Sequence, residues 1–229
     1  QIHLSVTDNC FLPCLHCDIW KNKEKDLPTE IWMDTLDRMA EWVGPASVNF
    51  VGGEPFLRKD LEEMMGHAVA LGNTVSFNTN AWLITSKRAK KVAEAGVDIA
   101  YISMDGFLED TVDHSRGRAG SWKKCMDAMD YLDAAGGPRV VISCILTGRN
   151  ATEIPALIDF VKERGYQLVV HPLYQNFGEV VYDPHWYKTS PLWPGDLALV
   201  DEAIEVLSAE RKAGGPVCNA TGQLQAMRN

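Results

Sequence analysis

The sequence lacks an apolar run of the ~20 residues that a membrane-spanning helix needs, and it lacks a signal-peptide pattern. Positive charge is also scarce, since 22 lysine and arginine residues stand against 31 aspartate and glutamate residues and the net charge is −9. A nucleic-acid-binding protein normally presents a basic face. We therefore expect a cytoplasmic protein that binds neither nucleic acid nor a membrane.

A further absence concerns cysteine pairing. Six cysteines occur in 229 residues, but a chain of this length can bury a full core without disulfides. No second CxxC motif follows the first, as many structural zinc sites would require. In a reducing cytoplasm, clustered cysteines usually serve metal or redox chemistry.

Three of the cysteines do cluster, in the stretch CFLPCLHC, as Cys10, Cys14 and Cys17. Three thiolates can hold three irons of a [4Fe–4S] cluster and leave the fourth iron open to a ligand. Zinc normally needs a fourth protein ligand, and His16, between two of the cysteines, is poorly spaced for that part. The motif favours an iron–sulfur cluster and leaves zinc as an alternative.

Strand-like and helix-like runs alternate along most of the chain. The expected strands are Ile2–Val6, Ser47–Val51, Thr74–Asn78, Ile99–Met104, Arg139–Leu146 and Gln167–Leu173. The expected helices are Glu30–Val43, Leu61–Leu71, Thr85–Ala95, Ser121–Ala135, Ala151–Arg164 and Asp196–Ala213. Six βα units predict an α/β fold with a parallel sheet, helices outside and right-handed crossovers. We expect one core over residues 1–215 and a C-terminal extension, 216–229, that could begin a further segment.

Polar and glycine-rich residues follow the first four expected strands. They are the cysteine run, Gly52-Gly53-Glu54-Pro55, Asn78-Thr79-Asn80 and Ser103-Met104-Asp105-Gly106. In α/β barrels the functional groups collect on loops at the carboxyl ends of the strands, so these motifs are expected on one rim.

Each rim motif suits contact with a polar ligand. The two glycines let backbone approach a ligand closely, and carbonyls with a carboxylate can grip an ammonium group. Asn80 and Ser103 offer contacts to a sugar or carboxylate, and Arg116 offers a bidentate fork for a carboxylate. Taken alone, each residue is also an ordinary turn, cap or surface residue.

Together these motifs resemble those of radical S-adenosylmethionine (SAM) enzymes. The resemblance rests on CxxxCxxC at residues 10–17, on GGEP at 52–55 and on ISMDGFLEDTVDHSRGRAGSW at 102–122. The last block is similar to that of peptide-modifying maturases and sulfatase-maturing enzymes. The resemblance implies a partial (β/α)6 barrel of the TIM type, with a cluster on the three cysteines and SAM on the open iron.

The same resemblance implies a contact for each matching position. Gly52, Gly53 and Glu54 would meet the methionine amino group of SAM. Asn80 and Ser103 would contact the ribose or methionine part, and Arg116 the carboxylate. His16 and Leu173 would lie near the adenine. Ala81 stands where this branch often has glycine, so the turn there is expected to differ slightly.

The implied activity is reductive cleavage of SAM. A flavodoxin- or ferredoxin-like donor would supply an electron, and the resulting 5′-deoxyadenosyl radical would abstract a hydrogen from a peptide or small-metabolite substrate. The alternative is a non-catalytic iron–sulfur or zinc protein such as an electron carrier. A carrier has no need of the ligand-gripping rim.

Other residues allow two interpretations. Cys125 and Cys144 are expected to be small core residues, although a functional role stays open. Cys218 has no partner at a cluster spacing. The long loop 174–193 either lines a substrate pocket or packs its aromatic side chains beneath the barrel. Those side chains are Tyr174, Phe177, His185, Trp186, Tyr187 and Trp193.

Overall fold

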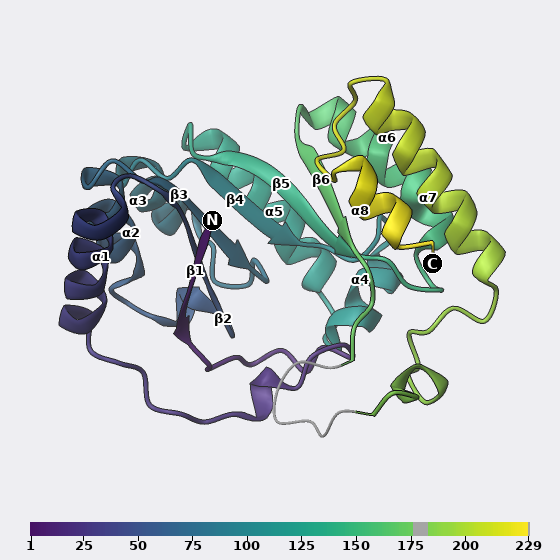
Figure 1. The fold of residues 1–229 in the computed structure, drawn as a ribbon, viewed down its shortest axis with the longest axis horizontal. Helices are drawn as coiled ribbons and strands as arrows, with labels where there is room; N and C mark the ends of the chain where they lie inside the picture. The colour runs from purple at the N-terminus through teal and green to yellow at the C-terminus, as the bar shows by residue number, and fades with distance from the viewer. Residues whose placement is uncertain (176–182, 229) are drawn as a thin grey trace. The chain divides into compact units, whose positions relative to one another are not determined.

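The computed structural model of the chain describes residues 1–175 and 183–228. Six strands form one sheet whose strand order follows the chain, β1-β2-β3-β4-β5-β6 (Figure 1). The strands are β1 (Ile2–Thr7), β2 (Ser47–Gly52), β3 (Thr74–Thr79), β4 (Ile99–Ser103), β5 (Arg139–Ile145) and β6 (Gln167–His171). The neighbouring pairs β1–β2, β2–β3, β3–β4 and β5–β6 are parallel. The expected α/β fold with a parallel sheet is confirmed.

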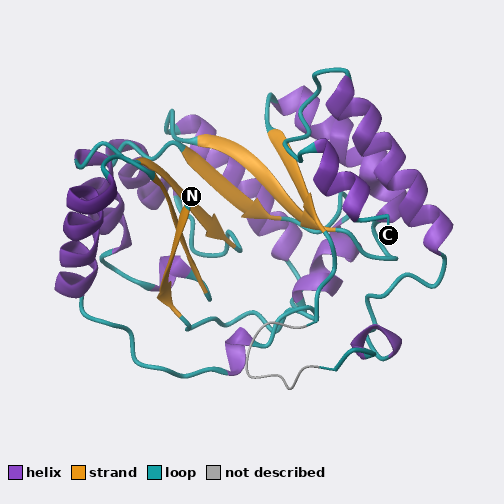
Figure 2. Cartoon of the chain, in the orientation of Figure 1, coloured by secondary structure: helices purple, strands orange, loops and turns teal. Residues whose placement is uncertain are grey.

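At least one helix separates each strand from the next, and further helices follow the last strand (Figure 2). They are α1 (Thr29–Val43), α2 (Leu61–Ala70), α3 (Ser86–Glu94), α4 (Glu109–Arg116), α5 (Ser121–Ala134), α6 (Ile154–Arg164), α7 (Leu197–Lys212) and α8 (Thr221–Ala226). Short 3-10 helices occupy Ile19–Lys21, Pro55–Leu57, Ala151–Glu153 and Trp186–Lys188. Within the described residues, no helix is long and apolar enough to cross a bilayer.

The chain folds as two compact units. The first comprises Gln1–Phe11, Ile19–Ile102 and Lys123–Val140, and the second comprises Leu12–Asp18, Ser103–Trp122 and Val141–Asn229. In the first unit, α2 packs against α1 and β3 (Figure 1). In the second, α6 packs on β6 and α7, and α8 packs on α7 (Figure 2).

The core of the first unit lies on the strands themselves. Phe50 of β2 and Phe77 of β3 are completely buried, and the ring of Phe56 meets Phe77 edge-on with 5.0 Å between centroids. Strands of a parallel sheet are covered on both faces, which explains their nearly continuous apolar sequences. Burial of these aromatic rings holds the strand ends in place, and the strand ends carry the motifs.

The predicted element order differs from the structure in detail. Helix α4 was expected only as a motif-bearing stretch, and α8 only as a helical-looking stretch near the last residue given. The last strand ends at His171 rather than Leu173. The reason is Pro172, which has no amide hydrogen to donate to a strand ladder.

Candidate cofactor site

The glycine turn after β2 is joined to the backbone that leads into Cys10. The amide of Gly53 donates to the Thr7 carbonyl at 2.7 Å, and the amide of Glu54 donates to the Asn9 carbonyl at 2.8 Å. A Cβ at position 53 would lie 2.3 Å from the Asn9 oxygen, so only glycine fits there. The turn and the start of the loop between β1 and α1, here called the cysteine loop (residues 8–28), therefore form one local structure.

The Glu54 carboxylate is completely buried beneath this turn. It accepts hydrogen bonds from the Phe56 amide at 3.1 Å, the Thr79 hydroxyl at 2.8 Å and the Asn80 amide at 2.7 Å. Burial raises the pKa of Glu54 to about 7, although these hydrogen bonds favour the ionised form. Because its oxygens already join the ends of β2 and β3, an ammonium group at this turn would be met by backbone carbonyls.

Asn80 follows β3 and faces the first cysteine. Its side-chain nitrogen lies 3.9 Å from Cys10 Sγ, and its side-chain oxygen accepts from the Trp82 amide at 3.1 Å. Between them, Ala81 has a φ of +70°, in the left-handed region that favours glycine. The turn thus keeps the glycine-type conformation although alanine occupies the position.

In the second unit, the turn that carries the other two cysteines packs on the end of α4. The Cys17 amide donates to the Cys14 carbonyl at 3.2 Å, and the Leu15 amide donates to the Ser115 carbonyl at 2.9 Å. Gly117 caps α4 in the left-handed conformation, and a Cβ there would lie 2.3 Å from the Pro13 oxygen. The helix end therefore supports the Cys14–Cys17 turn.

Asp105 connects α4 and β5 within this unit, and it was not among the predicted site residues. Its buried carboxylate accepts from Ser115 Oγ at 2.7 Å, from the Ile145 amide at 2.9 Å and from Arg116 Nη2 at 2.7 Å. Burial alone would raise the pKa of Asp105, but the Arg116 guanidinium and the hydrogen bonds outweigh it and lower the pKa. An ionised Asp105 fixes the side chain of Arg116. The signal in the sequence was a carboxylate followed by glycine at a strand end.

His16 is buried beside Asp105. Its Nδ1 lies 3.9 Å from an Asp105 oxygen and, among residues 1–175 and 183–228, has no hydrogen-bond partner. Burial lowers the pKa of His16 to about 4, against the opposing effect of Asp105, so the ring is neutral near pH 7. We regard the contact with Asp105 as a neutral ring beside a carboxylate, since desolvation outweighs their attraction.

The remaining expected residues occupy the ends of strands in the second unit. Ser103 ends β4 and is partly exposed, and Leu173 lies two residues beyond β6 and is partly exposed. His171, which the sequence analysis missed, ends β6, and burial lowers its pKa. A histidine at a strand end was the available signal.

The other three cysteines differ in burial, and several aromatic side chains after β6 contact one another. Cys125 and Cys144 are buried, as expected for core residues, and burial raises the pKa of the Cys144 thiol well above its usual value. Cys218 is exposed. In the loop after β6, the ring of Trp193 lies 5.6 Å from Trp186 and 5.0 Å from Tyr187, so these aromatics pack on one another. Phe177 lies outside the described residues.

Residues 4–161 match the family described as the Radical SAM superfamily. The chain belongs to this superfamily. It is 32% identical over 162 residues to Fe-coproporphyrin III synthase of Methanosarcina barkeri, a match that covers 69% of this chain and 40% of that protein. It is 30% identical over 158 residues to PqqA peptide cyclase of Bradyrhizobium diazoefficiens, covering 68% of this chain and 41% of that protein. The chain thus spans less than half the length of these two relatives.

The same fold occurs in solved structures of the superfamily. The crystal structure of Streptococcus suis SuiB bound to S-adenosylmethionine aligns with a TM-score of 0.74 and 19% identity. The alignment covers 94% of this chain and 48% of that chain. This likeness confirms the expected partial barrel of the radical SAM type.

Radical SAM proteins use SAM with an iron–sulfur cluster, and the residues present suit that pair. Cys10, Cys14 and Cys17 are partly exposed thiols, the softer donors that iron–sulfur clusters take, whereas Cys125 and Cys144 are buried. In residues 1–175 and 183–228, no three histidine, cysteine, aspartate or glutamate side chains form a ready-made ligand group. The cluster assignment therefore rests on the donor chemistry, the spacing of the cysteines and the family.

Proposed function

We propose that this chain is the catalytic core of a radical SAM enzyme. Cys10, Cys14 and Cys17 would hold a [4Fe–4S] cluster, and the cluster with SAM bound to it would supply the chemistry of reductive SAM cleavage. The observation that carries the proposal is the bonding of the Gly53 and Glu54 amides to the backbone just before Cys10. These two hydrogen bonds join the glycine turn, which would receive the amino group of SAM, to the loop whose thiols would bind iron.

Each residue of the site has a part in binding. Backbone carbonyls of Gly52, Gly53 and Glu54 receive the methionine amino group, and Arg116, held by Asp105, receives the carboxylate. Asn80 and Ser103 contact the ribose or methionine part of SAM. His16, neutral because it is buried, and Leu173 adjoin the adenine. Loaded with both groups and reduced, the site supplies the chemistry that cleaves SAM to a 5′-deoxyadenosyl radical.

The substrate and the electron donor complete the proposal. We favour a peptide substrate over a small metabolite, because one relative is named a peptide cyclase and one structural neighbour is SuiB bound to precursor peptide SuiA. A flavodoxin- or ferredoxin-like protein of the cytoplasm delivers the electron. Aromatic side chains of residues 183–193 adjoin the substrate rather than only each other.

The proposal is tested by anaerobic reconstitution with iron and sulfide, followed by SAM and dithionite. We expect a brown protein that releases 5′-deoxyadenosine. Replacement of Cys14 by alanine should abolish both the colour and the release, whereas Cys218→Ala, at an exposed cysteine outside the motif, should leave both unchanged. A brown wild-type protein that releases no 5′-deoxyadenosine would instead be an electron carrier.

A further inference from the structure

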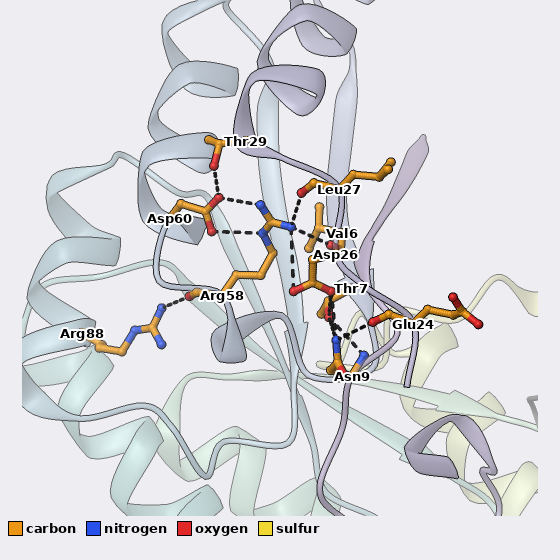
Figure 3. A network of polar contacts seen from close by, with 10 residues as sticks. All are labelled: Val6, Thr7, Asn9, Glu24, Asp26, Leu27, Thr29, Arg58, Asp60 and Arg88. Carbon is orange, nitrogen blue, oxygen red and sulfur yellow. Dashed lines mark hydrogen bonds and ion pairs between the residues drawn. The ribbon is translucent and has the colours of Figure 1, made fainter. Parts of the chain in front are cut away.

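The two ends of the cysteine loop are tied together by one carboxylate (Figure 3). Oδ1 of Asp26, near the end of the loop, accepts from the Thr7 hydroxyl at 2.6 Å and from Asn9 Nδ2 at 3.0 Å. Asn9 Nδ2 also donates to the Glu24 carbonyl at 3.2 Å. The residue directly before Cys10 is therefore bonded to the far end of the same loop.

A buried arginine makes a second link between the same two ends. Nη1 of Arg58 donates to the Val6 carbonyl at 3.2 Å and to the Leu27 carbonyl at 2.9 Å (Figure 3). Its side chain is only 5% exposed, and Asp26 Oδ2 lies 4.0 Å from the same nitrogen. Two different side chains thus link the ends of the loop, and they also form an ion pair with each other.

Arg58 is also held in place by residues outside the cysteine loop. Asp60 accepts from its Nε at 3.0 Å and from its Nη2 at 2.5 Å, a bidentate pair with fixed geometry. Thr29 donates to the same carboxylate, and Arg88 Nη2 donates to the Arg58 carbonyl at 3.0 Å (Figure 3). A guanidinium locked in this way loses little further freedom when it bonds the loop.

Thr7 and Asn9 are also held through their backbone carbonyls. Their carbonyls accept from the Gly53 and Glu54 amides of the glycine turn, while their side chains contact Asp26. The short segment before Cys10 therefore lies between two supports. The sequence offered no motif for the second support, because Asp26 and Arg58 are ordinary charged residues in it.

We propose that Asp26 and Arg58 form a clamp that closes the cysteine loop and fixes Cys10 for cluster binding. They are positioning residues, and the proposal rests on the proposed function of the three cysteines. A loop whose ends are already joined has fewer conformations to lose when its thiols bind a cluster. The clamp therefore slows loss of the cluster and orders the loop before the cluster is present.

The test compares Asp26→Ala, Asp26→Asn and Arg58→Lys with a matched control, Leu132→Ala. Leu132 is a buried residue of α5, so its truncation destabilises the fold without touching the clamp. Two quantities are measured: the rate at which a ferrous-iron chelator bleaches the reconstituted protein, and hydrogen exchange of residues 8–28 in the protein without iron.

We expect Asp26→Ala to lose its cluster at least about tenfold faster than wild type, the factor typical of one lost charge-assisted hydrogen bond. Asp26→Asn keeps an acceptor for Thr7 and should lie in between. Arg58→Lys keeps the charge but not the fork, and should also lose the cluster faster. Amides of residues 8–28 should exchange faster in all three variants, while those of β3 stay protected.

Three results would overturn parts of this account separately. Wild-type rates of cluster loss and exchange in Asp26→Ala would refute the clamp, and so would equally fast cluster loss in Leu132→Ala. If Arg58→Lys fails to fold, the two Asp26 variants still test the clamp. The Asp26 side chain is 34% exposed, so its replacement should not prevent folding. A wild-type protein that takes up no cluster would refute the proposed function, and hydrogen exchange would still judge the clamp.

Discussion

At the scale of single residues, two buried carboxylates hold other groups of the site in place, and they differ in protonation state. Asp105 is ionised beside Arg116, whereas burial leaves Glu54 close to half-protonated at neutral pH. Neither contacts a ligand by its own oxygens in the proposal. Both instead hold the groups that do, so their replacement should act through geometry and charge.

Asp105→Asn should weaken SAM binding, because it removes the charge that holds the Arg116 guanidinium. We expect the dissociation constant to rise about tenfold, equivalent to ~1.4 kcal/mol. Equilibrium dialysis with the reconstituted protein measures it. Ser115→Ala is the control, since it removes only a hydrogen bond from an uncharged donor to the same carboxylate, at 2.7 Å, and should give a smaller rise. An unchanged constant in Asp105→Asn would limit Asp105 to stability alone.

Glu54→Gln should change how stability depends on pH. The folded-state pKa is about 7, above the ordinary 4.5, so the folded protein holds this proton more tightly than the unfolded chain does. The resulting stability is fully present below about pH 4.5 and is lost as pH rises through about 7. Relative to Glu54→Gln, wild type should therefore lose up to about 3 kcal/mol across this window.

Urea unfolding of both proteins at pH 5.5 and pH 8 provides the measurement. Other titrating groups are shared by the two proteins and cancel in the difference. A difference that stays constant, or one that grows in favour of wild type at high pH, would contradict the buried, proton-holding state of Glu54.

Much of the residue pattern could be predicted because it lies in contiguous motifs. GGEP, the cysteine run and the SMDG block are visible in a few letters each. The partners of Glu54 are not, because Thr79 and Asn80 lie 25 and 26 residues away. The Glu54 carboxylate accepts hydrogen bonds from residues that only the folded chain brings close to it, and a local sequence pattern does not show such contacts. The same holds for Ala81, whose left-handed backbone is imposed by its surroundings.

At the scale of elements, the end of α4 acts as a support for the Cys14–Cys17 turn. This helix was not predicted because its residues, Glu109–Arg116, are few and mostly polar, and its N-terminus has no side-chain cap. The long, strongly patterned helices were predicted to within one residue at each end, except α6, which begins three residues later than expected, after a short 3-10 helix. Whether a short polar helix forms depends on the structure against which it packs, and its own sequence does not show that structure.

Gly117→Ala should cost more stability than Gly165→Ala. Both glycines cap helices in the left-handed conformation, with φ of +66° and +68°, so each substitution adds about 1 kcal/mol of backbone strain. A methyl at 165 meets open space, whereas one at 117 would lie 2.3 Å from the Pro13 oxygen. The difference in unfolding free energy, from urea titrations, should be at least about 1 kcal/mol.

The same pair of variants reports on the cysteine turn. Displacement of Pro13 should change the rate at which a thiol reagent modifies Cys14 in Gly117→Ala and leave it unchanged in Gly165→Ala. Equal stability losses and equal thiol reactivity would mean that α4 gives the turn no support.

At the scale of the whole molecule, most of the apolar core lies outside the cysteine loop, although Leu12 between Cys10 and Cys14 is buried. Completely buried residues such as Phe50, Phe77 and Ile102 belong to strands, and the cysteines lie on a partly exposed loop. The fold should therefore form without the cluster.

The triple variant with alanine at residues 10, 14 and 17 should keep cooperative urea unfolding, within about 1 kcal/mol of the iron-free wild type. Partly exposed side chains contribute little to stability, so the expected change is small. A protein that unfolds when its metal is removed would behave as a structural zinc domain does, and such a result would revive the zinc alternative.

The clamp also sets an order of events during synthesis. Sheet order follows chain order, so each new strand can pair with the one made just before it. The cysteine thiols leave the ribosome early, but Arg58 lies 31 residues beyond the Leu27 carbonyl that it bonds. Domains fold as their residues emerge. The Arg58 link therefore cannot form while β2 is being made, and the clamp is complete only after the chain has passed its second strand.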